Sequence, residues 1–176
     1  MIQHRLSPAA FATVALFVSG CAGPTPAGPR ASATLAATTG NATSGNVSFA
    51  QAGASVLVQG EVRGLKPNAQ HGFHVHEKGD CSSGDGMSAG GHFNPTGQPH
   101  GQHAAPGHHA GDLPSLQADG RGVAQFRFEA RAIAVGSGSS DIIGRALIVH
   151  RDPDDFTTQP TGNAGPRLAC AVIARS

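Results

Sequence analysis

Several short segments of the chain alternate between apolar and polar residues, which is the pattern of a β-strand with one buried face. In residues 56–63 valines alternate with mostly polar residues, and in residues 124–130 alanine and phenylalanine alternate with Gln, Arg and Glu. Strand signals begin at Ala33, and further strand segments are residues 71–77, 146–150 and 168–173. No segment has a convincing helical period. The pattern therefore predicts an all-β fold, an antiparallel Greek-key β-barrel or sandwich.

Two long segments, residues 78–116 and 151–166, have no apolar period. Loops of this length are uncommon in a compact domain unless they are functional. Glycine and proline are frequent, with 25 and 12 residues, so turns and loops must make up much of the chain. We expect a metal-binding loop in the first segment, ordered by its ligands instead of a core, and a polar, electrostatic loop in the second.

Histidine is concentrated in one stretch, because eight of the ten histidines lie between His71 and His109. A segment this rich in imidazole, followed closely by the carboxylate of Asp112, is typical of a metal site. His74 and His76 are two residues apart on an expected strand, so both side chains leave the same face. The sequence therefore predicts a metal centre before any other kind of site.

Charge and composition narrow the class of protein. The formal net charge is only +1 at pH 7, whereas a nucleic-acid-binding domain would show a basic stripe, so we expect no nucleic acid partner. There is no Trp and no Tyr, so the core must consist of Val, Ile, Leu, Ala and Phe. Beyond the N-terminal segment, no apolar run is long enough to span a bilayer.

The N-terminus is typical of an export signal, with Arg5 as its positive charge and residues 9–18 as its apolar segment. The following Val18-Ser19-Gly20-Cys21 resembles the lipobox of bacterial lipoproteins, in which the signal is cut before a cysteine that is then lipidated. The alternative is a plain secretory signal with a coincidental cysteine. Three regions are expected: a signal peptide at 1–20, a lipidated flexible tether at 21–33 and a folded domain at 34–176. The domain would be exported and anchored by lipid to a membrane of the cell envelope, on its periplasmic or another extracytoplasmic face.

Three cysteines is an odd number for an exported protein. If Cys21 carries lipid, Cys81 and Cys170 remain as one pair, and an oxidising compartment permits a disulfide between them. Such a disulfide would tie the histidine-rich loop to the last strand. The alternative is two free buried thiols.

Five segments of the sequence, in the same order, resemble the copper/zinc superoxide dismutases. They are Gly72-Phe73-His74-Val75-His76-Glu77, Gly91-His92-Phe93-Asn94-Pro95, His109-Ala110-Gly111-Asp112, Leu147-Ile148-Val149-His150 and Gly162-Asn163-Ala164-Gly165-Pro166-Arg167-Leu168-Ala169-Cys170. The match runs from about residue 46 to the C-terminus. Cys81 precedes His92 by eleven residues, which is similar to the bacterial branch of the family.

The resemblance implies two metal sites that share one ligand. Copper would be bound by His74, His76, His92 and His150. Zinc would be bound by His92, His100, His109 and Asp112. His92 would then bridge both ions as an imidazolate.

Further roles follow from the same resemblance. Arg167 would lie at the mouth of the copper channel, Asp154 would join a copper-side and a zinc-side histidine, and Cys81 and Cys170 would form the family disulfide. The remaining histidines of the stretch are not assigned, since a histidine beside a ligand is more often solvated than coordinated. They are His71, His103 and His108.

The implied activity is dismutation of superoxide to dioxygen and hydrogen peroxide by a redox-cycling copper. Imidazole suits both metals, and three histidines with one aspartate make a closed, structural zinc site. We therefore expect an oxidoreductase that protects the cell envelope from superoxide, with a homodimer left open. The alternative is a non-catalytic lipoprotein that stores or delivers copper and zinc on the same fold. The complete copper set and Arg167 favour the enzyme.

Overall fold

The computed structural model describes Met1 and residues 28–176. The rest of the predicted signal peptide and the predicted lipidation site, Cys21, lie outside the described residues and stay predictions. Within the described part of the chain, no helix is long and apolar enough to cross a membrane.

The described residues form ten strands and one short 3-10 helix. The elements are β1 (Arg30–Ala37), β2 (Ser44–Ala52), β3 (Ser55–Arg63), β4 (Gln70–His71), β5 (Phe73–His76), η1 (Met87–Ala89), β6 (Leu116–Gln117), β7 (Ala124–Ala130), β8 (Ala146–His150), β9 (Arg167–Val172) and β10 (Ala174–Arg175). One sheet has the order β5-β8-β9-β1-β2-β3-β7, with β10 paired to β1, and β4 pairs with β6 in a second sheet.

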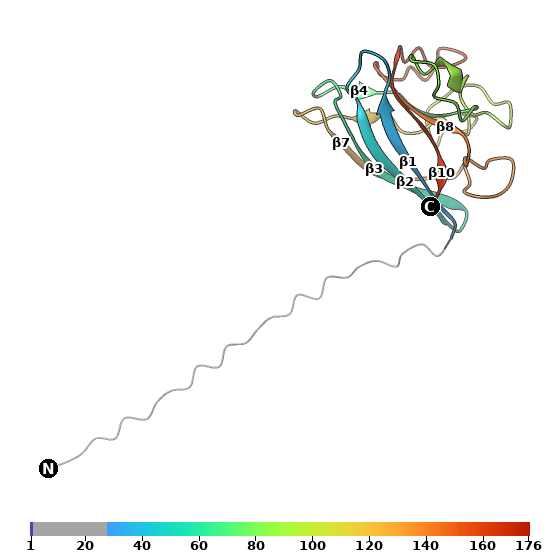
Figure 1. Cartoon of the computed structure of the whole chain (residues 1–176). Coiled ribbons are helices and arrows are strands. Elements are labelled where there is room, and N and C mark those ends of the chain that lie inside the picture. Colours follow the sequence, from blue (N-terminus) through green and yellow to red (C-terminus); the bar gives the residue numbers. More distant parts are fainter. Residues whose placement is uncertain (2–27) are drawn as a thin grey trace.

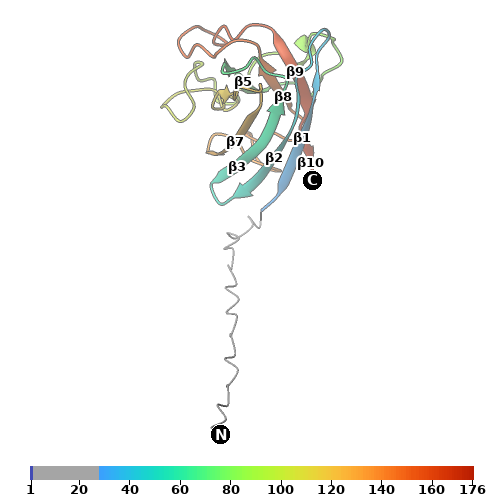
Figure 2. The ribbon, with the colours of Figure 1, turned by 90° about the vertical axis from the view of Figure 1, so that its left-hand side faces the viewer.

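The main sheet is antiparallel and curls into a half-barrel, as Figures 1 and 2 show. Neighbouring strands such as β3 and β7, or β1 and β9, are far apart in sequence. Long connections therefore cross between strands, as in Greek-key folds. This confirms the predicted all-β, antiparallel fold.

The inner face of the sheet forms an apolar core because alternate side chains of the strands point inwards. Val56, Val58 and Val62 of β3 are buried, as the alternation predicted. Phe73 packs edge-on against Phe126, with ring centroids 5.4 Å apart. With neither Trp nor Tyr in the chain, these aliphatic and phenylalanine side chains fill the core.

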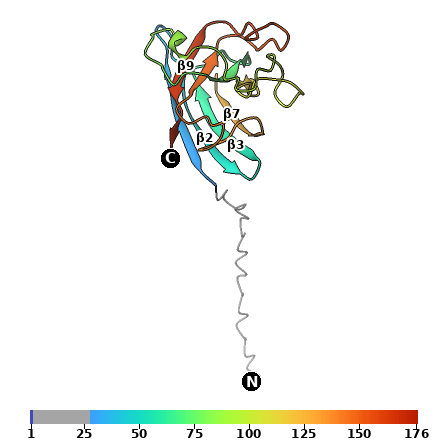
Figure 3. The same ribbon diagram turned by 90° about the vertical axis from the view of Figure 1, so that its right-hand side faces the viewer.

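Strands β5 and β8 differ from the others because every residue in them is buried. Phe73 and Val75 of β5 belong to the core. His74 and His76 alternate with them and therefore point to the opposite face. The long loops gather at one end of the sheet, away from the end at which β1 begins (Figures 1 and 3). A buried polar site can form where these loops cover β5 and β8.

Two boundaries differ from the prediction. Strand β1 begins at Arg30, so the folded domain starts before residue 34 and the expected tether at 21–33 is too long. The sequence signal was weak because Ala, Ser and Thr alternate in β1 with little contrast in polarity. The strand expected at 71–77 is split at Gly72, since β4 pairs with β6 and β5 pairs with β8.

A disulfide between Cys81 and Cys170 fixes the first long loop to β9, with the two Cα atoms 5.9 Å apart. This confirms the expected pair. Between β5 and β6 the only regular element is the short η1, and between β8 and β9 there is none. Both segments without an apolar period are therefore loops, as predicted.

Candidate metal centre

The first long loop lies along β5 through backbone hydrogen bonds. The N–H of Phe93 donates to the carbonyl of Val75 at 2.8 Å, and the N–H of Val75 donates to the carbonyl of Gly111 at 2.9 Å. A Cβ at Gly111 would lie 2.2 Å from the Val75 oxygen, so only glycine permits this approach. The pairing sets loop residues opposite the histidines of the strand: His92 opposite His76, and Asp112 opposite His74.

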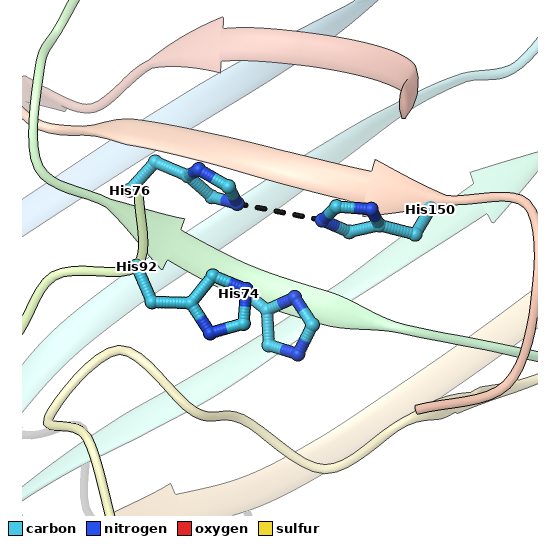
Figure 4. A group of neighbouring side chains, drawn as sticks. All are labelled: His74, His76, His92 and His150. Atoms are coloured by element: carbon cyan, nitrogen blue, oxygen red, sulfur yellow. Dashed lines mark hydrogen bonds between the residues drawn. The ribbon is translucent and has the colours of Figure 1, made fainter. Parts of the chain in front are cut away.

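Four imidazoles gather in a first cluster, called here the copper-side cluster. His74 and His76 come from β5, His150 ends β8, and His92 comes from the loop (Figure 4). All four residues are buried, and one ring nitrogen of each lies within 4.8 Å of the others. The resemblance implied that these four residues form one metal site, and the structure brings them together in space.

Hydrogen bonds fix the orientation of three of these rings. The Nδ1–H of His76 donates to the carbonyl of Gly90 at 3.0 Å, and the Nδ1–H of His150 donates to the carbonyl of Gly165 at 3.1 Å. The Nε2–H of His74 donates to Oδ2 of Asp154 at 2.9 Å. A neutral imidazole carries one N–H, so the other nitrogen of each ring presents a lone pair.

These lone pairs have no protein donor to accept from. Nε2 of His76 and Nε2 of His150 lie 3.4 Å apart, and each is the unprotonated nitrogen of its ring. Nδ1 of His74 and Nε2 of His92 are buried without a hydrogen-bond partner. A cation satisfies all of these atoms: metal–imidazole bonds of about 2.0–2.1 Å at a tetrahedral angle place two nitrogens about 3.3–3.4 Å apart. The residues therefore fit a copper ion, for which imidazole is a suitable ligand.

A second cluster, called here the zinc-side cluster, surrounds Asp112. Its Oδ1 lies 2.9 Å from Nδ1 of His92, 3.1 Å from Nδ1 of His100 and 3.4 Å from Nδ1 of His109. Its Oδ2 accepts hydrogen bonds from the backbone N–H groups of Gly101 and His109, which hold the carboxylate in place. Three imidazoles and one buried carboxylate fit the four-coordinate geometry of a structural zinc ion.

Burial keeps three of the copper-side rings, those of His76, His92 and His150, in the neutral form that binds metal. Burial lowers the pKa of His150 to about 3 and that of His92 to about 4, and it also lowers the pKa of His76. Burial would raise the pKa of Asp112, but hydrogen bonds from His100, His109 and His92 outweigh it and hold that pKa well below its ordinary value. At neutral pH His76, His92 and His150 are therefore neutral and Asp112 is ionised, which are the forms that bind metal. Burial would lower the pKa of His100, but hydrogen bonds to Asp112 and Asp154 raise it to about 10, so this ring must release a proton when it binds a metal.

Asp154, in the second long loop, contacts one histidine of each cluster. Its Oδ2 accepts from His74, and its Oδ1 lies 3.3 Å from Nε2 of His100, with the carboxylate only 1% exposed. Burial would raise the pKa of Asp154, but hydrogen bonds from His100 and His74 lower it to about 2. The structure thus places Asp154 where the resemblance implied, and its role toward bound metals stays a prediction.

Arg167 is the first residue of β9 and pairs in register with His150. Its guanidinium donates to the carbonyls of Gly86 and Gly90, both at 2.6 Å. The carbonyl of Gly90 also accepts from His76, so one backbone oxygen joins the guanidinium to a copper-side ring. A half-buried cation is therefore fixed beside the copper-side cluster, and it stays charged because arginine is not deprotonated in proteins.

The unassigned histidines belong to neither cluster. His103 and His108 are partly buried and bond backbone carbonyls through Nδ1. His71 was expected to be solvated, but it is fully buried, and its Nδ1–H donates to the carbonyl of His150 at 2.9 Å. The expectation was wrong for His71 because the chain at this point is bonded to the second long loop. The N–H of Gly72, the next residue, donates to the carbonyl of Asp152 in that loop.

Sequence reasoning also missed the groups that orient the rings. The carbonyls of Gly90 and Gly165 are backbone atoms, which any residue would supply, so the residue type carries no signal. Gln159 bonds both the N–H and the carbonyl of His100, although it lies 59 residues away. A glutamine in a polar loop has no pattern that would single it out.

Comparisons with known proteins agree with the geometry. The family model of copper/zinc superoxide dismutase (SODC) matches residues 43–173. Superoxide dismutase (Cu-Zn) 2 of Aquifex aeolicus (strain VF5) is 39% identical over 127 residues, which are 70% of this chain and 74% of the relative. Superoxide dismutase (Cu-Zn) of Paramecium bursaria Chlorella virus 1 is 44% identical over 133 residues, which are 72% of this chain and 70% of the relative.

A solved structure is also similar. The crystal structure of the clock protein EA4 has a TM-score of 0.76 and 39% sequence identity, and the match covers 86% of this chain and 98% of that chain. The family model spans most of the folded domain and contains all residues of both histidine clusters. The chain therefore belongs to the copper/zinc superoxide dismutase family, and is an oxidoreductase of that family with copper and zinc as its metals.

Proposed function

We propose that the chain dismutates superoxide with copper at the copper-side cluster and zinc at the zinc-side cluster. The observation that carries the proposal is the shared residue, because His92 belongs to both buried clusters. Its Nδ1 is directed at Asp112, at 2.9 Å, which leaves Nε2 for the copper-side cluster. One imidazole can therefore contact both metals, which a site built to hold two independent ions would not need.

Bound copper supplies one-electron chemistry, by which one superoxide is oxidised to dioxygen and a second is reduced and, with two protons, becomes hydrogen peroxide. The chain provides a place for a proton at Nε2 of His92, since Nδ1 of the same ring faces the zinc-side cluster. Asp154 orients the rings of His74 and His100 through their outer nitrogens. Such outer contacts fix ring orientation and raise the basicity of the ligating nitrogen.

Arg167 supplies the positive charge that a small anionic substrate requires. It is fixed by Gly86 and Gly90 beside the copper-side cluster, so its charge cannot move away from the reaction site. A fixed cation of this kind attracts the anion over a distance and binds it close by. A protein for metal storage or delivery would not need it, and Arg167 therefore favours the enzyme over that alternative.

We further propose that the enzyme works in the cell envelope, attached to a membrane by lipid on Cys21, and protects the envelope from superoxide. The support is the motif Val18-Ser19-Gly20-Cys21 after a charged and apolar N-terminal segment. The disulfide between Cys81 and Cys170 suits an oxidising compartment.

The anchor can be tested directly on the mature protein. Mass spectrometry of the N-terminal peptide, after expression in a bacterial host with lipoprotein processing, should show Cys21 as the first residue with two or three acyl chains. Cys21→Ser should release the protein from the membrane fraction without loss of dismutase activity. A mature N-terminus at another residue, without lipid, would show that the segment is a plain secretory signal.

A further inference from the structure

Gly162 lies where any side chain would strike the contact between Asp154 and His100. It is buried in the second long loop, with φ of +66°. A Cβ at this position would lie 2.1 Å from Oδ1 of Asp154 and 2.4 Å from Nε2 of His100. Both distances are far below van der Waals contact, and these same two atoms are only 3.3 Å apart in the structure.

The backbone on the Gly162 side cannot easily yield. The N–H of Gly162 donates to the carbonyl of Thr158 at 2.8 Å, and its carbonyl accepts from the N–H of Asp155, also at 2.8 Å. Moving Gly162 away from the contact would break these two bonds within the loop. A side chain at Gly162 must therefore displace its neighbours.

The neighbours are held as well. Gln159 accepts from the N–H of His100 at 2.8 Å and donates to its carbonyl at 2.9 Å, so the backbone of His100 is fixed to the same loop. Asp154 bonds His74 through its other oxygen, at 2.9 Å. A displaced Asp154 would lose either this copper-side bond or its approach to His100.

We propose that Gly162 is a positioning residue of the zinc-side cluster: by lacking a side chain, it provides the space in which Asp154 contacts the outer nitrogen of His100. Nδ1 of His100 faces Asp112 within the cluster, so Nε2 is the nitrogen that Asp154 must orient. The inference rests on the ligand sets of the proposed function. Removing an outer-shell contact typically weakens metal affinity by about 10–100-fold.

Gly97 provides a matched control for the backbone. It has the same φ of +66°, but a Cβ there would meet nothing within 4 Å. Alanine at either position is strained by the positive φ. Only at Gly162 does alanine also collide with the Asp154–His100 contact. A comparison of the two variants separates the need for space from the need for an unusual backbone conformation.

The test is zinc affinity of the full-length protein, measured by competition with a chromophoric zinc chelator. Gly162→Ala should bind zinc about 10–100-fold more weakly than the wild type, while Gly97→Ala binds it as the wild type does. Equal zinc affinity in the two alanine variants would overturn the proposal. A double variant, Asp154→Ala with Gly162→Ala, should lose less zinc affinity than the product of the two single losses, because both changes remove the same contact. A double variant whose loss equals that product would overturn the proposal. If Gly162→Ala alone does not fold, the double variant should fold, because removing the Asp154 carboxylate makes room for the new side chain, and a double variant that also fails to fold would overturn the proposal.

An NMR measurement distinguishes positioning from general loosening. In the zinc-loaded, copper-free wild type, the Nε2–H of His100 should exchange slowly with water because it faces Asp154. In Gly162→Ala it should exchange fast, while the Nδ1–H of His76, which bonds Gly90 outside this loop, stays protected. Fast exchange at both rings, or at neither, would contradict a local role for Gly162.

Failure of this inference can be told apart from failure of the ligand assignment. If His100→Ala binds zinc as tightly as the wild type, the assignment of His100 is wrong and the proposal falls with it. If His100→Ala loses zinc and Gly162→Ala keeps wild-type affinity, the ligand set stands and only the role of Gly162 is refuted.

Discussion

His92→Ala is expected to lower the dismutation rate about 100-fold or more and to weaken the binding of both metals. His92 is the one residue that belongs to both clusters, so its removal takes one ligand from each. It also removes Nε2, the atom proposed to hold a proton between the two half-reactions. Positioned proton donors of this kind contribute about 100-fold to 10,000-fold to the rate.

Two matched variants make the His92 result specific. His76→Ala removes a residue of the copper-side cluster alone and should lose copper while keeping zinc. His109→Ala removes a residue of the zinc-side cluster alone and should lose zinc affinity first. Metal content by elemental analysis and the rate by pulse radiolysis, measured on all three proteins, provide the comparison. A His92→Ala protein with both metals and an undiminished rate would refute the shared-ligand assignment.

Arg167→Glu should lower the second-order rate constant about 10-fold or more at low salt and leave the copper and zinc content unchanged. The change replaces a fixed cation with an anion beside the copper-side cluster. A difference of two unit charges there should weaken the electrostatic attraction of the anionic substrate by about 1 kcal/mol or more. Arg167→Lys should recover part of the rate, because it keeps the charge and loses the guanidinium geometry that bonds Gly86 and Gly90.

Salt dependence separates electrostatic guidance from a local disturbance. The rate of the wild type should fall as ionic strength rises, whereas that of Arg167→Glu should fall less or rise. Arg127→Glu makes the same charge change on β7, at the sheet edge opposite β5, and should behave almost as the wild type.

Arg167 also shares the Gly90 carbonyl with His76, so the copper EPR spectrum should be compared between the wild type and Arg167→Glu as a check on the geometry of the His76 ring. Equal rates for the wild type and Arg167→Glu at low salt would remove Arg167 from the mechanism.

The second long loop orients both clusters at once. Asp154 contacts His74 and His100, Gln159 fixes the backbone of His100, and the carbonyl of Gly165 accepts from His150. The loop also leads directly into Arg167 at the start of β9. A change in this loop is therefore expected to affect both metals and the guiding cation, although the loop itself supplies no residue to either cluster.

The sequence predicted those parts of the molecule in which residue type and spacing carry the information. The alternation of Val56, Val58 and Val62 with mostly polar residues predicted β3, and two histidines two residues apart on β5 predicted one face of a site. The strand β1 was placed too late, because alanine alternating with serine and threonine has little polarity contrast. The ligand clusters were brought together by resemblance to a family and not by the spacing alone.

What the sequence could not show depends on backbone atoms and on space. The carbonyls of Gly90 and Gly165 orient two rings, and any residue would supply a carbonyl. The burial of His71 could not be predicted, because the residues that bond to it and to Gly72 are His150 and Asp152, about 80 residues later in the chain. The glycine at 162 is visible in the sequence, but the reason for it appears only when Asp154 and His100 are seen to meet there.

The most direct test of the shared imidazole is a magnetic measurement on the wild type. Cobalt(II) is placed at the zinc-side cluster and copper(II) at the copper-side cluster, and the copper EPR signal is recorded with the magnetic susceptibility. If His92 bridges the two ions, the spins couple through the imidazole ring, and the EPR signal of isolated copper(II) should be largely lost. A full copper(II) signal, with the susceptibility equal to the sum of two independent ions, would contradict the bridge.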